Sequence, residues 1–324
     1  MAMQPDTHAK ARLRGPYPIT EQDISPLNVM FSEAFTDRYR RDGLVGVRVP
    51  PLNPVIWRYA IQNAADGAML WRDERGGIAA FNLAHHSGYE GWMGPLAVRE
   101  DCQGAGHGKV IVRAAIDHLK DVGCRVIGLE TMPRTMDNIG FYASMGFVPG
   151  RLTLTMTLDG APSLRAPTLL SALESAERER AIAACAALTN RVQPGYDYTR
   201  ELRLTAALGL GDTILLHEGD RLVGFALCHS TSLVEGRARE EIRVLKVVMQ
   251  DESLFSDMMP LLADYARRSG AIRAAIRVQS EHTRTFRTLV EVGARVRWTD
   301  LRMSLSDYEE RAPSSGLLIS NWEI

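Results

Sequence analysis

The chain has 324 residues, which is long enough for two domains of ordinary size. Hydrophobic residues make up 45% of it and charged residues 24%, the balance of a soluble globular protein. The net charge is −1 and basic and acidic residues are mixed along the chain, so we expect no nucleic-acid partner and no membrane partner. No apolar run is long enough to span a bilayer.

The N-terminal segment and the cysteines indicate the compartment. Residues 1–15 are polar and lack the apolar core of a secretory signal, so we expect a partly disordered lead-in. The cysteines are few and form no CxxC pair, which predicts neither a zinc site nor a disulfide framework. We therefore expect a cytoplasmic protein without a metal. The cysteines are Cys102, Cys124, Cys185 and Cys228.

The first half of the chain predicts a mixture of helices and strands. Thr20 is an N-cap candidate for a helix that extends to about Tyr39, and a short helix follows the prolines, at 55–64. The hydrophobic period then changes to that of strands. The further predicted elements are a hairpin at 67–72 and 78–85, a strand at 89–98 with a bulge at Gly94-Pro95, a helix at 110–122, a strand at 125–131, a helix at 138–145 and a strand at 147–158.

The second half repeats this order after a linker. Residues 159–167 are rich in Pro, Gly, Ser and Ala, so we expect domains at 16–158 and 168–324. Matching positions recur at nearly constant spacing, for example Phe81 with Phe225 and Gly146 with Gly293, which predicts a tandem repeat of one α+β unit. The expected elements are helices at 168–190 and 198–208, a hairpin at 213–217 and 222–229, a strand at 243–249, a helix at 254–268, a strand at 271–278, a helix at 283–292 and a strand at 296–305.

A glycine-rich loop joins the strand at 89–98 to the next helix. Its sequence is Gln103-Gly104-Ala105-Gly106-His107-Gly108. Alternating glycines let consecutive N–H groups converge, and the helix dipole adds partial positive charge, so a pyrophosphate is the natural ligand. A Walker loop would need Ser or Thr after Lys109, where this chain has Val110. A dinucleotide fingerprint would need a βαβ unit, whereas a hairpin precedes this loop.

The loop fits the Gln/Arg-x-x-Gly-x-Gly/Ala pattern of the GCN5-related N-acetyltransferases (GNAT). The segment from Asn138 through Tyr142 to Gly146-Phe147 is similar to the family's downstream helix and strand, and residues 16–158 resemble the family throughout. One departure is His107, where the family usually has an apolar residue. The resemblance implies an α+β fold class with two tandem GNAT folds, each a mixed, mostly antiparallel sheet flanked by helices.

The resemblance also implies acetyl-CoA as co-substrate and a set of residues that would bind it. The backbone of the strand before the loop would pair with the pantetheine arm, and the loop would hold the pyrophosphate. Asn138 would contact the pantetheine or the adenosine-side arm, and Tyr142 would protonate the leaving thiolate. A backbone N–H of the strand would stabilise the oxyanion. The backbone contacts would come from Leu96, Ala97 and Val98, and from Gln103, Gly104, Ala105, Gly106, His107, Gly108 and Lys109.

An attacking amine must lose a proton, so a general base is expected. Glu90, early in the bulged strand, is the first candidate, and Glu130 on the following strand is the second. His85 and His86 would act through a water. For each carboxylate, a salt-bridged structural role competes with the catalytic one.

The second copy lacks the features of the site. Residues 248–254 contain no glycine, and Asp251 and Glu252 would repel a pyrophosphate. Arg287 stands where Tyr142 stands in the first copy. We therefore predict that the second half keeps the fold, has lost the cofactor site, and covers the first domain, shapes the acceptor cleft or forms a homodimer.

Three functions remain open on the sequence. The first is an N-acetyltransferase that acts on a primary amine of a small molecule or peptide. The second is a non-catalytic sensor that binds acyl-CoA, and the third is a scaffold with a degenerate fold. No motif identifies the acceptor.

Overall fold

The computed structural model describes residues 13–322, so most of the expected N-terminal lead-in lies outside the described residues. Its last residues are not disordered, because Arg14–Pro18 form strand β1, antiparallel to β2. Among residues 13–322, no helix is both long and apolar enough to cross a membrane.

The elements of the first half follow the predicted order, with ends shifted by a few residues. The first helix begins at Ile24 because Thr20 caps a 3-10 turn, where Asp23 accepts a hydrogen bond from the Thr20 N–H at 2.9 Å. The elements after β1 are α1 (Ile24–Arg41), α2 (Pro54–Ala64), β2 (Ala68–Arg72), β3 (Ile78–Ser87), β4 (Glu90–Val98), α3 (His107–Asp121), β5 (Val126–Thr131), α4 (Met136–Ala143) and β6 (Phe147–Asp159).

The second half differs from its prediction at both ends. The helix expected at 168–190 begins only at Ser175, because Thr168–Leu169 pair with β8 as strand β7. A last strand, β13 (Leu317–Ser320), was not predicted. The other elements are α5 (Ser175–Val192), α6 (Thr199–Ala207), β8 (Gly211–Glu218), β9 (Arg221–His229), β10 (Glu241–Met249), α7 (Phe255–Arg268), β11 (Arg273–Gln279), α8 (Thr283–Glu291) and β12 (Arg295–Leu305).

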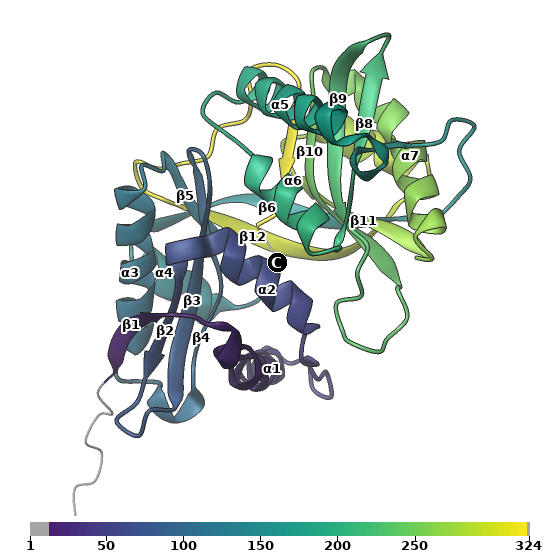
Figure 1. The fold of residues 1–324 in the computed structure, drawn as a ribbon. Coiled ribbons are helices and arrows are strands. Elements are labelled where there is room, and N and C mark those ends of the chain that lie inside the picture. Colours follow the sequence, from purple (N-terminus) through teal and green to yellow (C-terminus); the bar gives the residue numbers. More distant parts are fainter. Residues whose placement is uncertain (1–12, 323–324) are drawn as a thin grey trace, which may run out of the picture.

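The two halves share one continuous sheet because they exchange a strand each (Figure 1). Strand β12 of the second half pairs with β5 of the first, and β6 of the first half pairs with β11 of the second. Strands β6 and β12 also pair with each other in the middle of the sheet. The ranges 16–158 and 168–324 therefore divide the sequence but do not correspond to two separate sheets.

Three buried clusters hold the layers together. One lies under α3 and α4 of the first half, and a second lies under α7 and α8 of the second half. The third cluster joins the halves, because it combines side chains of α1 and α2 with side chains of α5 and α6. Figure 1 shows the two halves on either side of the long strand β12, with the end of the described chain at their junction. The junction is therefore part of the core of the protein.

Candidate active site

The glycine-rich loop turns from β4 into α3 through two residues with left-handed backbone. Gly104 has φ +77° and Gly106 has φ +83°, a region that strains residues with a side chain. Gly106 is the N-cap of α3, so the helix begins at His107 and not at the predicted Val110. A Cβ on Gly108 would lie 3.2 Å from Phe141 of α4, so this glycine allows α3 and α4 to approach each other. All three glycines are thus required by local geometry.

The loop presents N–H groups that could bind an anion. Within residues 13–322, the N–H groups of residues 104–108 donate no hydrogen bond outside the helix. The side chain of Gln103 turns back to donate to the Val98 carbonyl at 2.8 Å, which ties the loop to the end of β4. The His107 ring lies 3.0 Å from the Cys102 carbonyl, so the departure from the family pattern fits the loop. Free amides at the start of a 15-residue helix form a suitable anion site.

Strands β4 and β5 separate beyond a short paired segment. They pair in parallel from Glu90 to Trp92 on β4 and from Val126 to Gly128 on β5. The rest of β4, residues 93–98, is paired only with β3. The predicted bulge at Gly94-Pro95 is confirmed by the register shift in that pairing. The edge of β4 that faces β5 is therefore open, and it includes Leu96, Ala97 and Val98.

Tyr142 lies on α4 beside this gap. It belongs to the same buried cluster as Met93 of β4 and Leu129 of β5, and its ring contacts Phe147 edge-on. Burial raises the pKa of its hydroxyl to about 12, so the group stays protonated at neutral pH. No hydrogen-bond partner of this hydroxyl is found in the described part of the chain, and the oxygen is not among the fully enclosed polar atoms. Asn138, in the first turn of α4, is half-buried.

Glu90 is not placed to act as a base. It is completely buried, and its Oε2 accepts a hydrogen bond from the Tyr198 hydroxyl at 3.0 Å. Its Oε1 accepts from Trp322 Nε1 at 2.7 Å, and Lys246 Nζ lies 3.5 Å from Oε2. These partners come from the second half, which makes Glu90 a carboxylate of the junction. These contacts favour the salt-bridged alternative for Glu90.

Glu130 is also held in ion pairs. Its Oε2 lies 2.5 Å from Arg277 Nη2, and its Oε1 lies 3.0 Å from Arg302 Nε. Burial by itself would raise the pKa of Glu130, but the two guanidiniums outweigh it and lower the pKa to about 2. A carboxylate with so low a pKa is too weak a base to accept a proton from an ammonium at neutral pH. The ion pairs and the lowered pKa therefore favour the salt-bridged alternative for Glu130 as well.

The histidines are occupied in a similar way. His85 is buried and stacks on Trp92, with ring centroids 4.1 Å apart. Its Nε2 lies 3.2 Å from the Gly94 carbonyl, which can only accept, so Nε2 carries the proton and Nδ1 accepts from Asn63 at 3.3 Å. Burial lowers the pKa of His85 to about 3. His86 is half-buried beside Arg200, and burial also lowers its pKa.

The second half has the same gap, but the gap is filled. Strands β10 and β11 pair in parallel only from Glu241 to Val244. Beyond that point, β13 pairs antiparallel with β10, from Lys246–Ser320 to Met249–Leu317. The Gln279 side chain of β11 donates to the Ser320 carbonyl at 3.3 Å on the other side of β13. The chain's own last strand thus occupies the space that is open between β4 and β5.

Two residues near the site were missed by the sequence reasoning. Arg41 of α1 reaches the loop, where its Nη1 lies 3.4 Å from Gln103 Oε1. Trp322 reaches Gly128 at the point where β4 and β5 separate. Neither residue belongs to a local motif, and each is far in sequence from the residue that it contacts. Only the folded chain could identify them.

The site combines a glycine-rich loop at a helix N-terminus with an open strand edge and a buried tyrosine. This combination defines the acyl-CoA N-acyltransferase class of fold. Residues 33–147 match the model of the acetyltransferase (GNAT) family, so the chain carries a domain of this family. The predicted family and fold class are confirmed.

Solved structures resemble the chain over nearly its whole length. A putative acetyltransferase from Pyrococcus horikoshii has a TM-score of 0.66 and 16% identity, and the match covers 99% of this chain and 98% of that one. A tandem GNAT protein from the clavulanic acid biosynthesis pathway has a TM-score of 0.58 and 12% identity, with 93% and 100% covered. N-myristoyltransferase from Saccharomyces cerevisiae, solved with bound myristoyl-CoA, has a TM-score of 0.64 and 9% identity, with 96% and 86% covered. At such identities the likeness shows the fold. No curated protein sequence matches the chain.

Proposed function

We propose that the protein is an acetyl-CoA-dependent N-acetyltransferase that acts on a primary amine of a small molecule or a peptide. The observation that carries this proposal is the open edge of β4, residues 93–98, which leads directly into the free amides of residues 104–108. A pantetheine arm can pair with a strand edge as an added strand would, and its pyrophosphate then reaches the helix N-terminus. The second half offers neither feature, which supports one site in each chain.

The bound thioester would be held by the chain at both ends. The amides of the loop would bind the pyrophosphate, with Lys109 and Arg41 as nearby cations. The backbone from Leu96 to Val98 would align the pantetheine, and Asn138 would contact this arm from α4. Positioning of this kind contributes about 7–11 kcal/mol to the lowering of a barrier.

The reaction needs one group transfer and three proton movements. The neutral amine attacks the thioester carbonyl, an N–C bond forms, and the C–S bond breaks. The leaving thiolate takes the proton of the Tyr142 hydroxyl, and a backbone N–H on the open edge of β4 stabilises the oxygen as charge develops on it. Since Glu90, Glu130 and His85 are engaged elsewhere, the ammonium proton passes to water before the attack. The second proton, which the nitrogen of the adduct loses, returns through water to the Tyr142 oxygen.

A panel of primary amines tests the proposal, with acetyl-CoA and detection of the free thiol that is released. We expect thiol release to depend on the amine and the amine to gain an acetyl group by mass spectrometry. If acetyl-CoA binds in calorimetry and no amine in a broad panel is acetylated, a sensor that binds acyl-CoA becomes the better description. Absence of binding would contradict both.

A further inference from the structure

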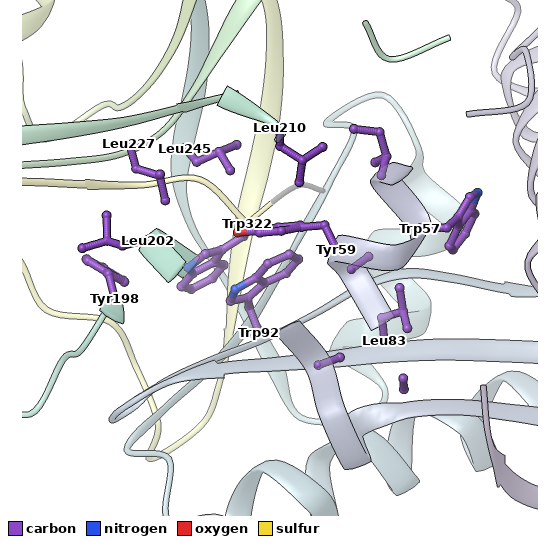
Figure 2. Packing of buried hydrophobic residues seen from close by; sticks show 14 of the residues in the cluster. Trp57, Tyr59, Leu83, Trp92, Tyr198, Leu202, Leu210, Leu227, Leu245 and Trp322 are labelled. Carbon is purple, nitrogen blue, oxygen red and sulfur yellow. The ribbon is translucent and has the colours of Figure 1, made fainter. Parts of the chain in front are cut away.

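Trp322 brings the end of the second half to the point where β4 and β5 separate. Gly128 and Trp92 form the last pair between these strands. The Trp322 ring lies over Gly128, with ring atoms 2.2 and 2.5 Å from the place that a Cβ would take. Figure 2 shows the indole rings of Trp92 and Trp322 next to each other, and both residues belong to the buried cluster that joins the halves. Two indoles therefore close this end of the gap on the face that looks toward the second half.

The acyl group of a donor would point toward this closed end. If the pyrophosphate binds after Val98, the pantetheine runs along β4 from the loop toward Met93, and the thioester lies nearest the paired segment. An acyl chain that continues in this direction meets Trp92 and Trp322. This step rests on the proposed function, because it takes the direction of the donor from it.

There is little space behind the indoles. The cavity beyond Trp92 has a volume of about 10 Å³ and is lined by Tyr59, Asn63, Lys246 and other residues of both halves. It holds about one water, and no alkyl chain. On the opposite face of the sheet, Met93 and Ile127 are buried in the cluster under α3. Within residues 13–322, a longer chain would therefore have to displace buried side chains next to Trp92 on one face and next to Met93 on the other.

Trp322 is fixed in place by contacts on its edge and on its face. Its Nε1 donates to Glu90 Oε1 at 2.7 Å, and the ring is 3% exposed. The Arg302 guanidinium lies 3.8 Å from the ring centroid, in the geometry of a cation–π contact. A ring held in this way resists displacement by a longer acyl chain.

We propose that Trp322 forms, with Trp92, the end wall of the acyl subsite and restricts the donor to short acyl thioesters such as acetyl-CoA. The second half thereby contributes to the site of the first half. Its own gap is filled by β13, and the same strand delivers Trp322 to the junction. The wall is a specificity determinant and takes no part in the transfer itself.

The test compares acetyl-, butyryl- and hexanoyl-CoA as donors for the wild type, Trp322→Ala and Trp322→Phe, by kcat/KM with one accepted amine. The wild type should prefer acetyl-CoA to hexanoyl-CoA by about tenfold or more, and Trp322→Ala should reduce this ratio by about tenfold or more. Trp322→Phe should keep more of the wild-type preference than Trp322→Ala, because it keeps an aromatic ring, although it loses part of the indole and the hydrogen bond to Glu90. Equal donor ratios in Trp322→Ala and the wild type would overturn the proposal.

Binding of the same thioesters without an acceptor separates this proposal from the proposed function. If the wild type binds neither acetyl-CoA nor hexanoyl-CoA in calorimetry, the proposed function fails. If it binds the two equally, only the end wall fails. If Trp322→Ala does not give a cooperative thermal transition, Trp322→Leu replaces it in the test. Trp322→Leu should also raise kcat/KM for hexanoyl-CoA relative to that for acetyl-CoA.

Discussion

The gap between β4 and β5 and the gap between β10 and β11 are the same feature of the fold with different contents. In the first half the edge of β4 is open and leads to free amides at a helix N-terminus. In the second half β13 pairs with the corresponding edge of β10, and residues 248–254, which lead into α7, contain no glycine. An open strand edge is a binding opportunity and also a liability, since it can pair with any extended chain. We propose that the first half keeps this edge for a ligand; the second half pairs it with its own strand β13.

The halves also differ where they meet. Glu130 of β5 and Arg277 of β11 hold equivalent positions, four residues after Val126 and Arg273, which begin the parallel pairing in each half. The strand exchange brings these equivalent positions together as an ion pair of 2.5 Å. Two identical halves would place like charges in contact at this point. Divergence of the two copies thus stabilises their exchange.

We expect the largest difference between the two halves when Tyr142 of α4 is substituted. Tyr142→Phe removes the proposed proton donor and should lower kcat about 10²–10⁴-fold, because that is the usual contribution of a positioned acid. KM for acetyl-CoA should change little, since the ring remains. Steady-state kinetics with an accepted amine measure both. Arg287→Ala alters the matching position of the second half and should leave kcat as it is; wild-type turnover by Tyr142→Phe would contradict the assignment.

The ion pairs of the exchanged strands should contribute strongly to stability. Glu130→Gln leaves the buried guanidiniums of Arg277 and Arg302 without their shared carboxylate, and we expect a loss of about 3–5 kcal/mol in the free energy of unfolding. Denaturant titration measures this loss. The double variant with Arg277→Met should lose less, because Arg302 is then the one buried guanidinium of the pair that has lost Glu130, and Arg302 keeps its contact with Glu310. An unchanged midpoint for Glu130→Gln would show that the exchange does not need this pair.

The stability that Glu130 contributes should depend on pH in one direction. The folded-state pKa of Glu130 is about 2, below its ordinary value of 4.5. The unfolded chain therefore takes up the proton first, and the stabilisation by this carboxylate, present above pH 4.5, is lost as pH falls from about 4.5 to 2. Glu130→Gln should show a shallower decline of stability over this window than the wild type. Parallel curves would contradict the depressed pKa.

Strand β13 fills the gap of the second half, and the fold should need it for stability. The gap of the first half is open, and the fold should be stable without a ligand there. Ile319 is fully buried and pairs with Val247, so Ile319→Ala should cost about 2–5 kcal/mol. The first half should gain stability from a ligand: acetyl-CoA at 100 times its Kd is expected to add about 2.7 kcal/mol. Thermal melts of the wild type and of Ile319→Ala, with and without acetyl-CoA, compare the effect of the strand with the effect of the ligand. If acetyl-CoA does not raise the melting temperature of the wild type, a ligand in the first gap does not stabilise the fold as β13 does in the second gap.

The loop glycines should show the smallest effect. Gly106→Ala places a Cβ on a residue with φ +83°, which costs about 1–2 kcal/mol and tilts the amides of the loop. We expect the Kd for coenzyme A in calorimetry to rise about tenfold. The control is Ser253→Ala in the corresponding turn of the second half, which should leave the Kd as it is. A Kd equal to that of the wild type in Gly106→Ala would place the phosphates elsewhere.

Short-range patterns in the amino-acid sequence are enough to predict the local features of this protein. The order of elements, the repeat, the bulge at Gly94-Pro95 and the glycine loop all follow from short-range patterns, because period, turn chemistry and helix capping act over a few residues. The family resemblance also rests on such local segments. For this reason the loop, the open strand and Tyr142 could be named before the fold was known.

The tertiary structure alone decided which strands pair and which polar groups are free. The alternation of apolar and polar residues along β6 and β12 would be the same in either half, so it does not predict that the two halves exchange these strands. Leu317–Ser320 is too short to be identified as a strand without its partner β10. Glu90 looked available because its partners Tyr198 and Trp322 are far away in sequence. Burial and ion pairing depend on contacts across the chain, and these contacts engage Glu90 at the junction and bring Trp322 next to Gly128.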